Sequence, residues 1–149
     1  MWIDERGSEV LGLPECRRLL AVGAKEHRHG HLSVPADGAP SVLPVDYVVQ
    51  GPDVIVRVGE GLFKRLRDQL VAFQVDGADR GARPDGSDRP WSVLVRGLAT
   101  EEDESALGSN LPVASVSRPG RRLVRIRGDV VTGRRLGDAP RKGAGTAER

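Results

Sequence analysis

Residues 40–75 have the sequence PSVLPVDYVVQGPDVIVRVGEGLFKRLRDQLVAFQV, and this stretch decides the fold. It contains Pro44-Val45-Asp46-Tyr47 in an apolar strand, a turn at Gly51, a second apolar strand, and then Arg57-Val58-Gly59-Glu60-Gly61-Leu62-Phe63-Lys64. A glycine-rich turn that leads into a short basic helix can direct backbone N–H groups at a phosphate. Lys64 is either a ligand of such a phosphate or an ordinary exposed helix lysine.

Strand patterns dominate the chain on both sides of this stretch. Apolar runs bounded by turn residues, among them Asp37-Gly38, are typical of antiparallel hairpins. Short helices are predicted over residues 13–23, 61–69 and 101–107, and residues 76–89 are predicted to be a loop. The pattern favours a mainly β (α+β) fold, an antiparallel barrel of six strands with short flanking helices. The strands are predicted at residues 31–34, 41–49, 54–58, 70–75, 91–100 and 122–132. On residues 91–100, Trp91, Val93, Val95 and Ala99 share one face, and Ser92, Leu94, Arg96 and Leu98 share the other.

Composition limits the classes of protein and partner. A chain of 149 residues fits one domain with one core, which we place at residues 1–136, followed by a disordered tail at 137–149. The formal net charge of +2 gives weak steering, so we interpret the arginines of residues 118–135 as a solvated strand face and predict no nucleic-acid partner. One cysteine excludes an intramolecular disulfide, and no stretch suits a membrane helix or signal peptide. A cytoplasmic protein is expected.

Three alternating histidines raise the question of a metal site. His27, His29 and His31 would share one face of a continuous strand, a spacing that could hold zinc. No neighbouring cysteine or carboxylate completes the set, so we predict no metal site and interpret the histidines as a polar edge, solvated or facing a second subunit. Cys16 is interpreted as a packing residue rather than a reactive thiol.

The order of several motifs resembles the small bacterial members of the pyridoxamine 5′-phosphate oxidase-like family, the flavin mononucleotide (FMN)-binding split β-barrels. The resemblance covers roughly residues 13–136 and is carried by Glu15-Cys16-Arg17-Arg18-Leu19-Leu20, Pro44-Val45-Asp46-Tyr47, Arg57-Val58-Gly59-Glu60-Gly61, Val71-Ala72-Phe73-Gln74-Val75-Asp76, Trp91-Ser92-Val93-Leu94-Val95-Arg96-Gly97 and Val124-Arg125-Ile126 through Gly133-Arg134-Arg135. The resemblance implies a homodimer with two FMN sites at the subunit interface.

The resemblance also implies where the cofactor would bind. Pro44, Val45 and Tyr47 on one strand and Trp91, Ser92 and Val93 on another would flank the flavin ring, and Val58, Gly59, Gly61 and Lys64 would meet its phosphate. The flavin would take electrons from a reduced nicotinamide cofactor and pass them to a small-molecule substrate. A deazaflavin is the alternative cofactor, and no catalytic side chain is named. From residue type alone, Tyr47 either lines the cofactor or fills an interface, and Trp91 is a packing residue.

A second hypothesis is a barrel without cofactor that works as a dimeric binding or scaffold protein. Ala39 replaces the basic residue that the family usually has ahead of the second strand, and Leu62 and Phe63 replace a hydroxyl and a basic residue in the phosphate turn. Arg57 or Arg65 could compensate for the missing charge. The absorption spectrum with and without added cofactor separates the two hypotheses.

Overall fold

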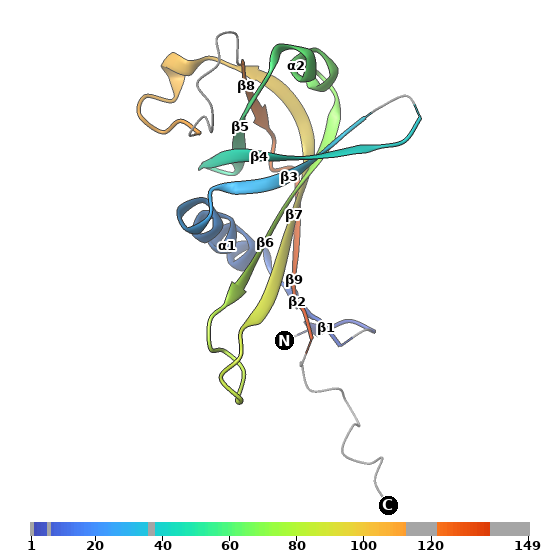
Figure 1. Ribbon diagram of the computed structural model, residues 1–149, viewed down its shortest axis with the longest axis vertical. Helices are drawn as coiled ribbons and strands as arrows, with labels where there is room; N and C mark the ends of the chain where they lie inside the picture. Colours follow the sequence, from blue (N-terminus) through green and yellow to red (C-terminus); the bar gives the residue numbers. More distant parts are fainter. Residues whose placement is uncertain (1, 6, 36–37, 113–121, 138–149) are drawn as a thin grey trace, which may run out of the picture.

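The computed structural model describes residues 2–5, 7–35, 38–112 and 122–137 (Figure 1). Its elements in chain order are β1 (Trp2–Ile3), β2 (Glu9–Leu11), α1 (Leu13–Glu26), β3 (His29–Val34), β4 (Ser41–Gln50), β5 (Asp53–Val58), α2 (Glu60–Leu66), β6 (Leu70–Asp79), β7 (Arg89–Glu102), the 3₁₀ turn η1 (Glu104–Ala106), β8 (Arg122–Ile126) and β9 (Val130–Arg135). Most of the described chain is therefore β-structure with two α-helices.

Strands β3 to β8 close into an antiparallel barrel. The order β7-β6-β3-β4-β5-β8 returns to β7, because β8 also pairs with the last part of that strand. Residues 91–96 of β7 pair instead with β9. Outside the closed ring, β9 pairs with β2, and β2 pairs with β1. These pairings confirm the predicted mainly β, six-stranded antiparallel split barrel with short flanking helices.

Two backbones approach closely where β7 changes partner. A Cβ atom on Gly97 would lie 1.9 Å from the carbonyl oxygen of Arg127, so this position requires glycine. The N–H of Arg127 donates to the carbonyl oxygen of Leu98 at 3.0 Å. Beside it, the N–H of Gly128 donates to Asp53 Oδ1 at 2.9 Å, which ties the start of β5 to the turn after β8.

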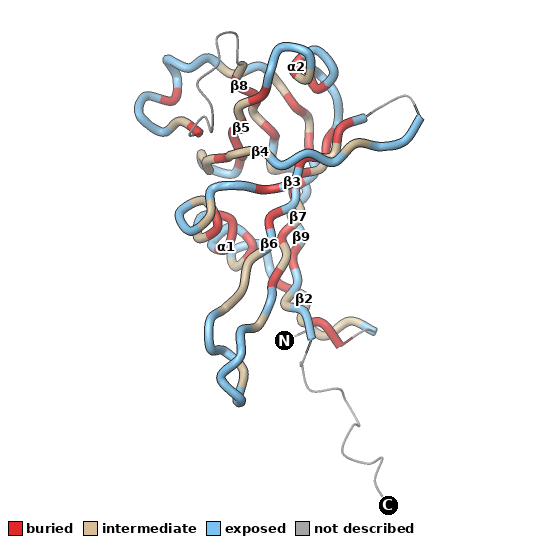
Figure 2. The backbone as a smooth tube through the Cα atoms, in the orientation of Figure 1, coloured by how far each residue is buried: buried red, intermediate tan, exposed pale blue. Residues whose placement is uncertain are grey.

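Side chains that alternate along the strands fill the barrel. The inward set predicted on β7 is confirmed, because Trp91, Val93, Val95 and Ala99 are at most 1 % exposed. In Figure 2 buried positions recur along the barrel strands, whereas the tip of the β6–β7 hairpin is exposed. Cys16 is buried in α1, as predicted, and contributes to the same core.

Tyr47 attaches α1 to the barrel. Its hydroxyl donates to the carbonyl oxygen of Leu20 at 2.6 Å, and its ring lies edge-on to Phe73 with the centroids 5.1 Å apart. The prediction that the helix ends near Gly23 is wrong, because α1 continues to Glu26. A Cβ on Gly23 would lie 2.7 Å from the Tyr47 hydroxyl oxygen, so this glycine permits close packing.

The predicted closing strand over residues 122–132 is also wrong, because it is two strands. β8 ends at Ile126 and β9 begins at Val130. Gly128 and Asp129 lie between them, where the chain leaves the closed barrel and crosses to the other part of β7.

Other boundaries differ for local reasons. α2 ends at Leu66 rather than residue 69, because Asp68 has a φ of 62° and donates its N–H to the carbonyl oxygen of Ala99. β6 and β7 extend into residues 76–79 and 89, so the predicted loop is shorter. The acidic segment is helical only over Glu104–Ala106, and β1 and β2 were not predicted.

No helix in the described ranges is long and apolar enough to cross a bilayer. Residues 138–149 of the predicted tail lie outside the described part of the chain. The domain boundary at residue 136 and the cytoplasmic location stay predictions.

Candidate functional site

The structure brings most of the predicted cofactor residues to the junction of β4, β5 and α2. Tyr47 pairs with Val56 in antiparallel register, so the two strands continue with Val45 near Val58. Pro44 precedes Val45 on β4. Gly59, Gly61 and Lys64 follow in the turn and helix after β5. The strand that would flank the ring and the turn that would meet the phosphate are therefore neighbours in one chain.

The group on β7 lies apart from this junction. Cross-strand pairs join Pro44 to His31, His31 to Gln74 and Gln74 to Leu94, so β3 and β6 separate β4 from β7. Three strand spacings amount to about 14 Å. Ser92 and its neighbours on β7 thus do not reach the β4–α2 junction within one chain.

Only some predicted residues present their side chains outward. Tyr47, Val58, Trp91 and Val93 are at most 2 % exposed, and Val45 packs against the same core. Pro44, Gly59, Gly61 and Lys64 are exposed, and Ser92 is half-buried on the outer face of β7. A bound molecule outside the barrel would meet the inward residues mainly through their backbone.

The turn at the start of α2 is open to an approaching group. A Cβ on Gly59 or Gly61 would meet no atom within 4 Å. Lys64 is exposed, and the described residues offer it no ion pair. Glu60 lies in the same turn, but both of its oxygens accept from Arg122 Nη1 at 3.2 Å, which offsets its charge. The turn therefore suits a phosphate, with Lys64 beside it as a cation that the described residues leave without an ion pair.

Leu62 and Phe63 fasten α2 to the barrel. Phe63 is 2 % exposed, and Leu62 packs against the same core. The guanidinium carbon of Arg122 lies 4.2 Å from the centroid of the Phe63 ring. Because both side chains face the barrel, neither blocks the open side of the turn.

Three adjoining hollows cover the outer face of β3, β6, β7 and β9. One of about 940 Å³ is lined by Trp91, Ser92, Gln74 and Arg134, among others. A second of about 720 Å³ contains Leu70, Val130 and Arg96, and a smaller one of about 270 Å³ contains His31, Gln74 and Leu94. The alternation predicted for β7 had placed Leu94 and Arg96 outward. The hollows extend the site well beyond the residues that the motifs indicated, because those motifs mark inward positions.

The three histidines do not lie on one continuous strand. His27 follows the end of α1, and Arg28 has a φ of 64°, so only His29 and His31 belong to β3. The rings of His27 and His29 are 5.0 Å apart and edge-on. Within the described residues, no group of three or more metal-binding side chains is arranged to hold an ion.

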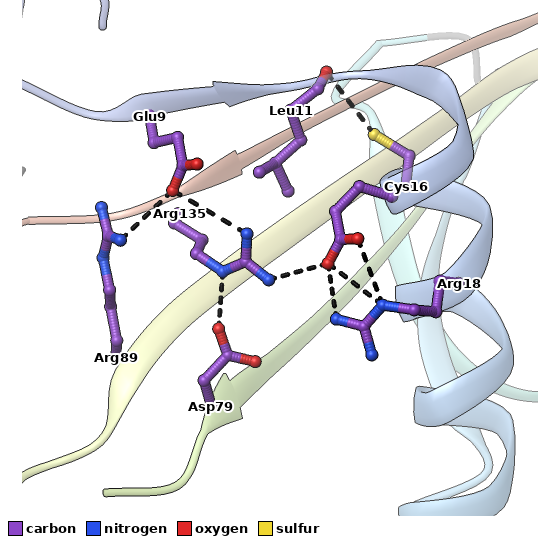
Figure 3. A network of polar contacts seen from close by, with 8 residues as sticks. Glu9, Leu11, Cys16, Arg18, Asp79, Arg89 and Arg135 are labelled. Atoms are coloured by element: carbon purple, nitrogen blue, oxygen red, sulfur yellow. Dashed lines mark hydrogen bonds and ion pairs between the residues drawn. The ribbon is translucent and has the colours of Figure 1, made fainter. Parts of the chain in front are cut away.

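Arg135 joins elements that are distant in sequence. Its Nε donates to Asp79 at 2.5 Å and its Nη2 to Glu15 at 2.8 Å, and Nη1 lies 3.8 Å from Glu9 (Figure 3). Arg89 Nη1 also donates to Glu9, at 3.2 Å. This network connects α1, β2, β6, β7 and β9 at the open end of the split sheet.

Ion pairs also change the interpretation of the C-terminal arginines. The predicted solvated strand face is wrong for Arg125 and Arg135, whose side chains are only 17 % and 15 % exposed and pair with carboxylates. Arg122 and Arg134 also pair with carboxylates but stay 35 % and 52 % exposed. Arg118 and Arg121 lie outside the described residues. Hydrogen bonds from Arg18 and then Arg135 lower the pKa of Glu15 from its usual 4.5 to about 2. These ion pairs connect β8 and β9 to carboxylates on other elements of the fold.

Comparisons with known proteins agree with the fold. The family described as pyridoxamine 5′-phosphate oxidase matches residues 14–135. The FAD binding protein from Mycobacterium smegmatis is 28 % identical, with a TM-score of 0.65 over 87 % of this chain and 100 % of that one. A FAD-binding protein from Mesorhizobium loti is 20 % identical, with a TM-score of 0.65 over 87 % of this chain and 99 % of that one. The search of curated proteins found no match.

Proposed function

The chain belongs to the pyridoxamine 5′-phosphate oxidase family, and from that premise we propose that it is a flavin-dependent oxidoreductase that works as a homodimer. The observation that carries the proposal is the outer face of the split sheet, where adjoining hollows of about 940, 720 and 270 Å³ lie beside Ser92 and reach His31, the cross-strand neighbour of Pro44. Hollows of this size suit a cofactor and a small substrate.

The charge pattern at α2 supports a phosphorylated cofactor. Lys64 supplies a cation that has no ion pair among the described residues, and Gly59 and Gly61 leave the backbone accessible. FMN is the cofactor that the motifs predict, whereas two of the matched structures are of FAD-binding proteins. Both cofactors present the same ring and a phosphate, so the residues at α2 accommodate either one.

The separation within the site supports a dimer. Pro44 and Ser92 lie on strands that are three spacings, about 14 Å, apart along the sheet, so we infer that one ring does not contact both in a single chain. A second copy packed on the same face would bring its own β7 to the β4–α2 junction. One apolar side chain that such packing would cover is Val42, which is 60 % exposed.

The residues of the chain bind and orient the cofactor rather than carry the redox chemistry. A bound flavin supplies hydride or electron transfer. Lys64 and the α2 turn would hold its phosphate, and the backbone of residues 44–47 would meet the edge of its ring. Pro44 and the apolar outer face would exclude water from the ring. The inward packing of Tyr47 and Trp91 fixes the two strands without placing either ring against the cofactor.

The proposal also covers the electron donor, the electron acceptor and the location of the protein. We propose a reduced nicotinamide as electron donor, a small molecule as acceptor and the cytoplasm as location.

The test is a titration of purified protein with FMN, FAD, riboflavin and a deazaflavin, followed by flavin fluorescence and absorption. Binding of FMN or FAD, together with Lys64→Gln weakening both more than riboflavin, supports the proposal. Expected losses are about tenfold, the cost of one charge-assisted contact. Preference for the deazaflavin changes the cofactor but keeps the site. Colourless protein that binds none of the four at 100-fold excess overturns the flavin function and favours the cofactor-free scaffold.

A further inference from the structure

Within the described part of the chain, Arg96 is an unpaired cation with apolar neighbours on the two adjoining strands. It lies on β7, and its cross-strand neighbours are Ala72 on β6 and Val130 on β9. The described residues give it neither a hydrogen bond nor an ion pair. In contrast, Arg125 and Arg135, which also lie on strands of this sheet, each pair with carboxylates at 2.8 Å or less.

The hollow beside Arg96 is mainly apolar. It has a volume of about 720 Å³, and its walls include Leu70, Val71, Ala72 and Val130. Arg96 is the cation among its lining residues, and it also lines the neighbouring hollow of about 940 Å³. A guanidinium at the edge of a mainly apolar hollow can bind a carboxylate with two parallel hydrogen bonds while the rest of a ligand lies against hydrocarbon.

We propose that Arg96 and the hollow lined by Leu70, Ala72 and Val130 bind an amphipathic anion, a small molecule with one carboxylate and an apolar chain or ring. Its carboxylate pairs with the Arg96 guanidinium, and its apolar part lies in the hollow. The assignment of this anion as the substrate of the redox reaction rests on the function proposed above, whereas binding at Arg96 does not.

Asp129 adds a negative charge to the lining of this hollow. It is the carboxylate among the lining residues, and it precedes Val130, the cross-strand neighbour of Arg96. No ion pair joins it to Arg96 within the described residues. Because a neighbouring negative charge weakens the attraction for an anionic ligand, removing this carboxylate strengthens binding at Arg96.

Two other anions compete for the same guanidinium. The phosphate of the flavin is one, and a carboxylate of the second copy of this chain is the other. The cofactor's phosphate would have Lys64 and the α2 turn, which follow β5 and not the part of β7 that contains Arg96. The apolar walls next to Arg96 favour a ligand that is mostly hydrocarbon rather than the charged chain of a phosphate or a polar contact between subunits.

The experiment uses octanoate as the probe and octanamide as its uncharged analogue, with binding measured by isothermal titration calorimetry on the full chain without added flavin. The variants are Arg96→Gln, Asp129→Asn and, as the matched control, Arg80→Gln, which neutralises an exposed arginine in the β6–β7 loop. We expect Arg96→Gln to weaken octanoate binding about tenfold to a hundredfold. Asp129→Asn strengthens it, and Arg80→Gln and the affinity for octanamide stay unchanged.

Several results overturn the proposal. Equal affinity for octanoate and octanamide, or an octanoate affinity that does not depend on Arg96, removes the anion site. Weaker binding of FMN but not riboflavin to the Arg96→Gln variant assigns the guanidinium to the cofactor. A shift from dimer to monomer in that variant, measured by sedimentation, assigns it to the subunit interface. Since the probe is titrated without flavin, octanoate binding that depends on Arg96 upholds the anion site even when the flavin titration fails.

Discussion

Tyr47 of β4 donates its hydroxyl hydrogen to the carbonyl oxygen of Leu20 in α1 across 2.6 Å of buried core. Burial raises the pKa of this hydroxyl above its usual value, so it remains a donor at any physiological pH. We expect Tyr47→Phe to lower the free energy of unfolding by about 1 kcal/mol, measured by urea denaturation. Flavin affinity stays the same because the side chain faces inward. Weaker flavin binding at unchanged stability would show that Tyr47 lines the cofactor.

Gly23 allows the same contact to form, and the two positions should be coupled. A Cβ on Gly23 would lie 2.7 Å from the Tyr47 hydroxyl oxygen and 2.9 Å from Val75 Cγ1. Gly23→Ala should therefore cost about 2 kcal/mol of stability. The cost should fall by at least ~0.5 kcal/mol in a Tyr47→Phe background, which lacks the hydroxyl. Strictly additive effects in this double-mutant cycle would contradict the contact.

Asp53 links β5 to the corner between β8 and β9. Its Oδ2 accepts from Arg125 at 2.8 Å and its Oδ1 from the N–H of Gly128 at 2.9 Å, and its side chain is 10 % exposed. Asp53→Asn should destabilise the protein by about 2–3 kcal/mol, since it leaves a mostly buried guanidinium with less charge compensation. The control is Glu104→Gln, whose side chain is 64 % exposed and 3.8 Å from Arg57. Its expected effect in the same chemical denaturation is below about 0.5 kcal/mol.

The barrel was predictable because its strands are amphipathic and joined by recognisable turns. The corner at Gly128 and Asp129 was not, because apolar residues continue on both sides of it, with Ile126 before and Val130 after. What separates β8 from β9 is the carboxylate of Asp53, which lies 75 residues away in the sequence. Hydrophobic periodicity depends only on residues close in sequence. It therefore cannot predict that β7 pairs first with β9 and then with β8, because this exchange depends on a distant hydrogen bond.

The candidate site was predictable only in part, because the motifs indicated residues that pack inward and gave no signal for Arg96. Motif resemblance indicated Tyr47 and Trp91, whose inward packing is confirmed only by the structure. Arg96 carried no motif signal beyond its outward position on a strand. Its isolation became visible once the structure placed Ala72 of β6 and Val130 of β9 beside it, with no carboxylate partner among the residues described.

Glu15 should make stability depend on acid pH. Its pKa is lowered from 4.5 to about 2 by hydrogen bonds from Arg18 and Arg135. A carboxyl whose pKa is lower in the folded state stabilises the fold fully above pH 4.5, and this contribution is lost as the pH falls toward 2. Urea midpoints measured between pH 6 and 2 should therefore fall less steeply for Glu15→Gln than for the unmodified protein. Glu26→Gln, at the exposed end of the same helix, is the control and should retain the full slope.

Gly97 and Gly61 should respond in opposite ways to alanine. A Cβ on Gly97 would lie 1.9 Å from the Arg127 carbonyl oxygen, and backbone on both sides prevents relief by a simple side-chain rotation. Gly97→Ala should therefore cost more than about 3 kcal/mol or prevent folding. At Gly61, in α2, the added methyl meets no atom within 4 Å, so Gly61→Ala should raise stability by up to about 1 kcal/mol through helix propensity. Thermal unfolding followed by circular dichroism compares the two variants, and equal tolerance at both positions would mean that β7 and the turn after β8 do not meet at Gly97.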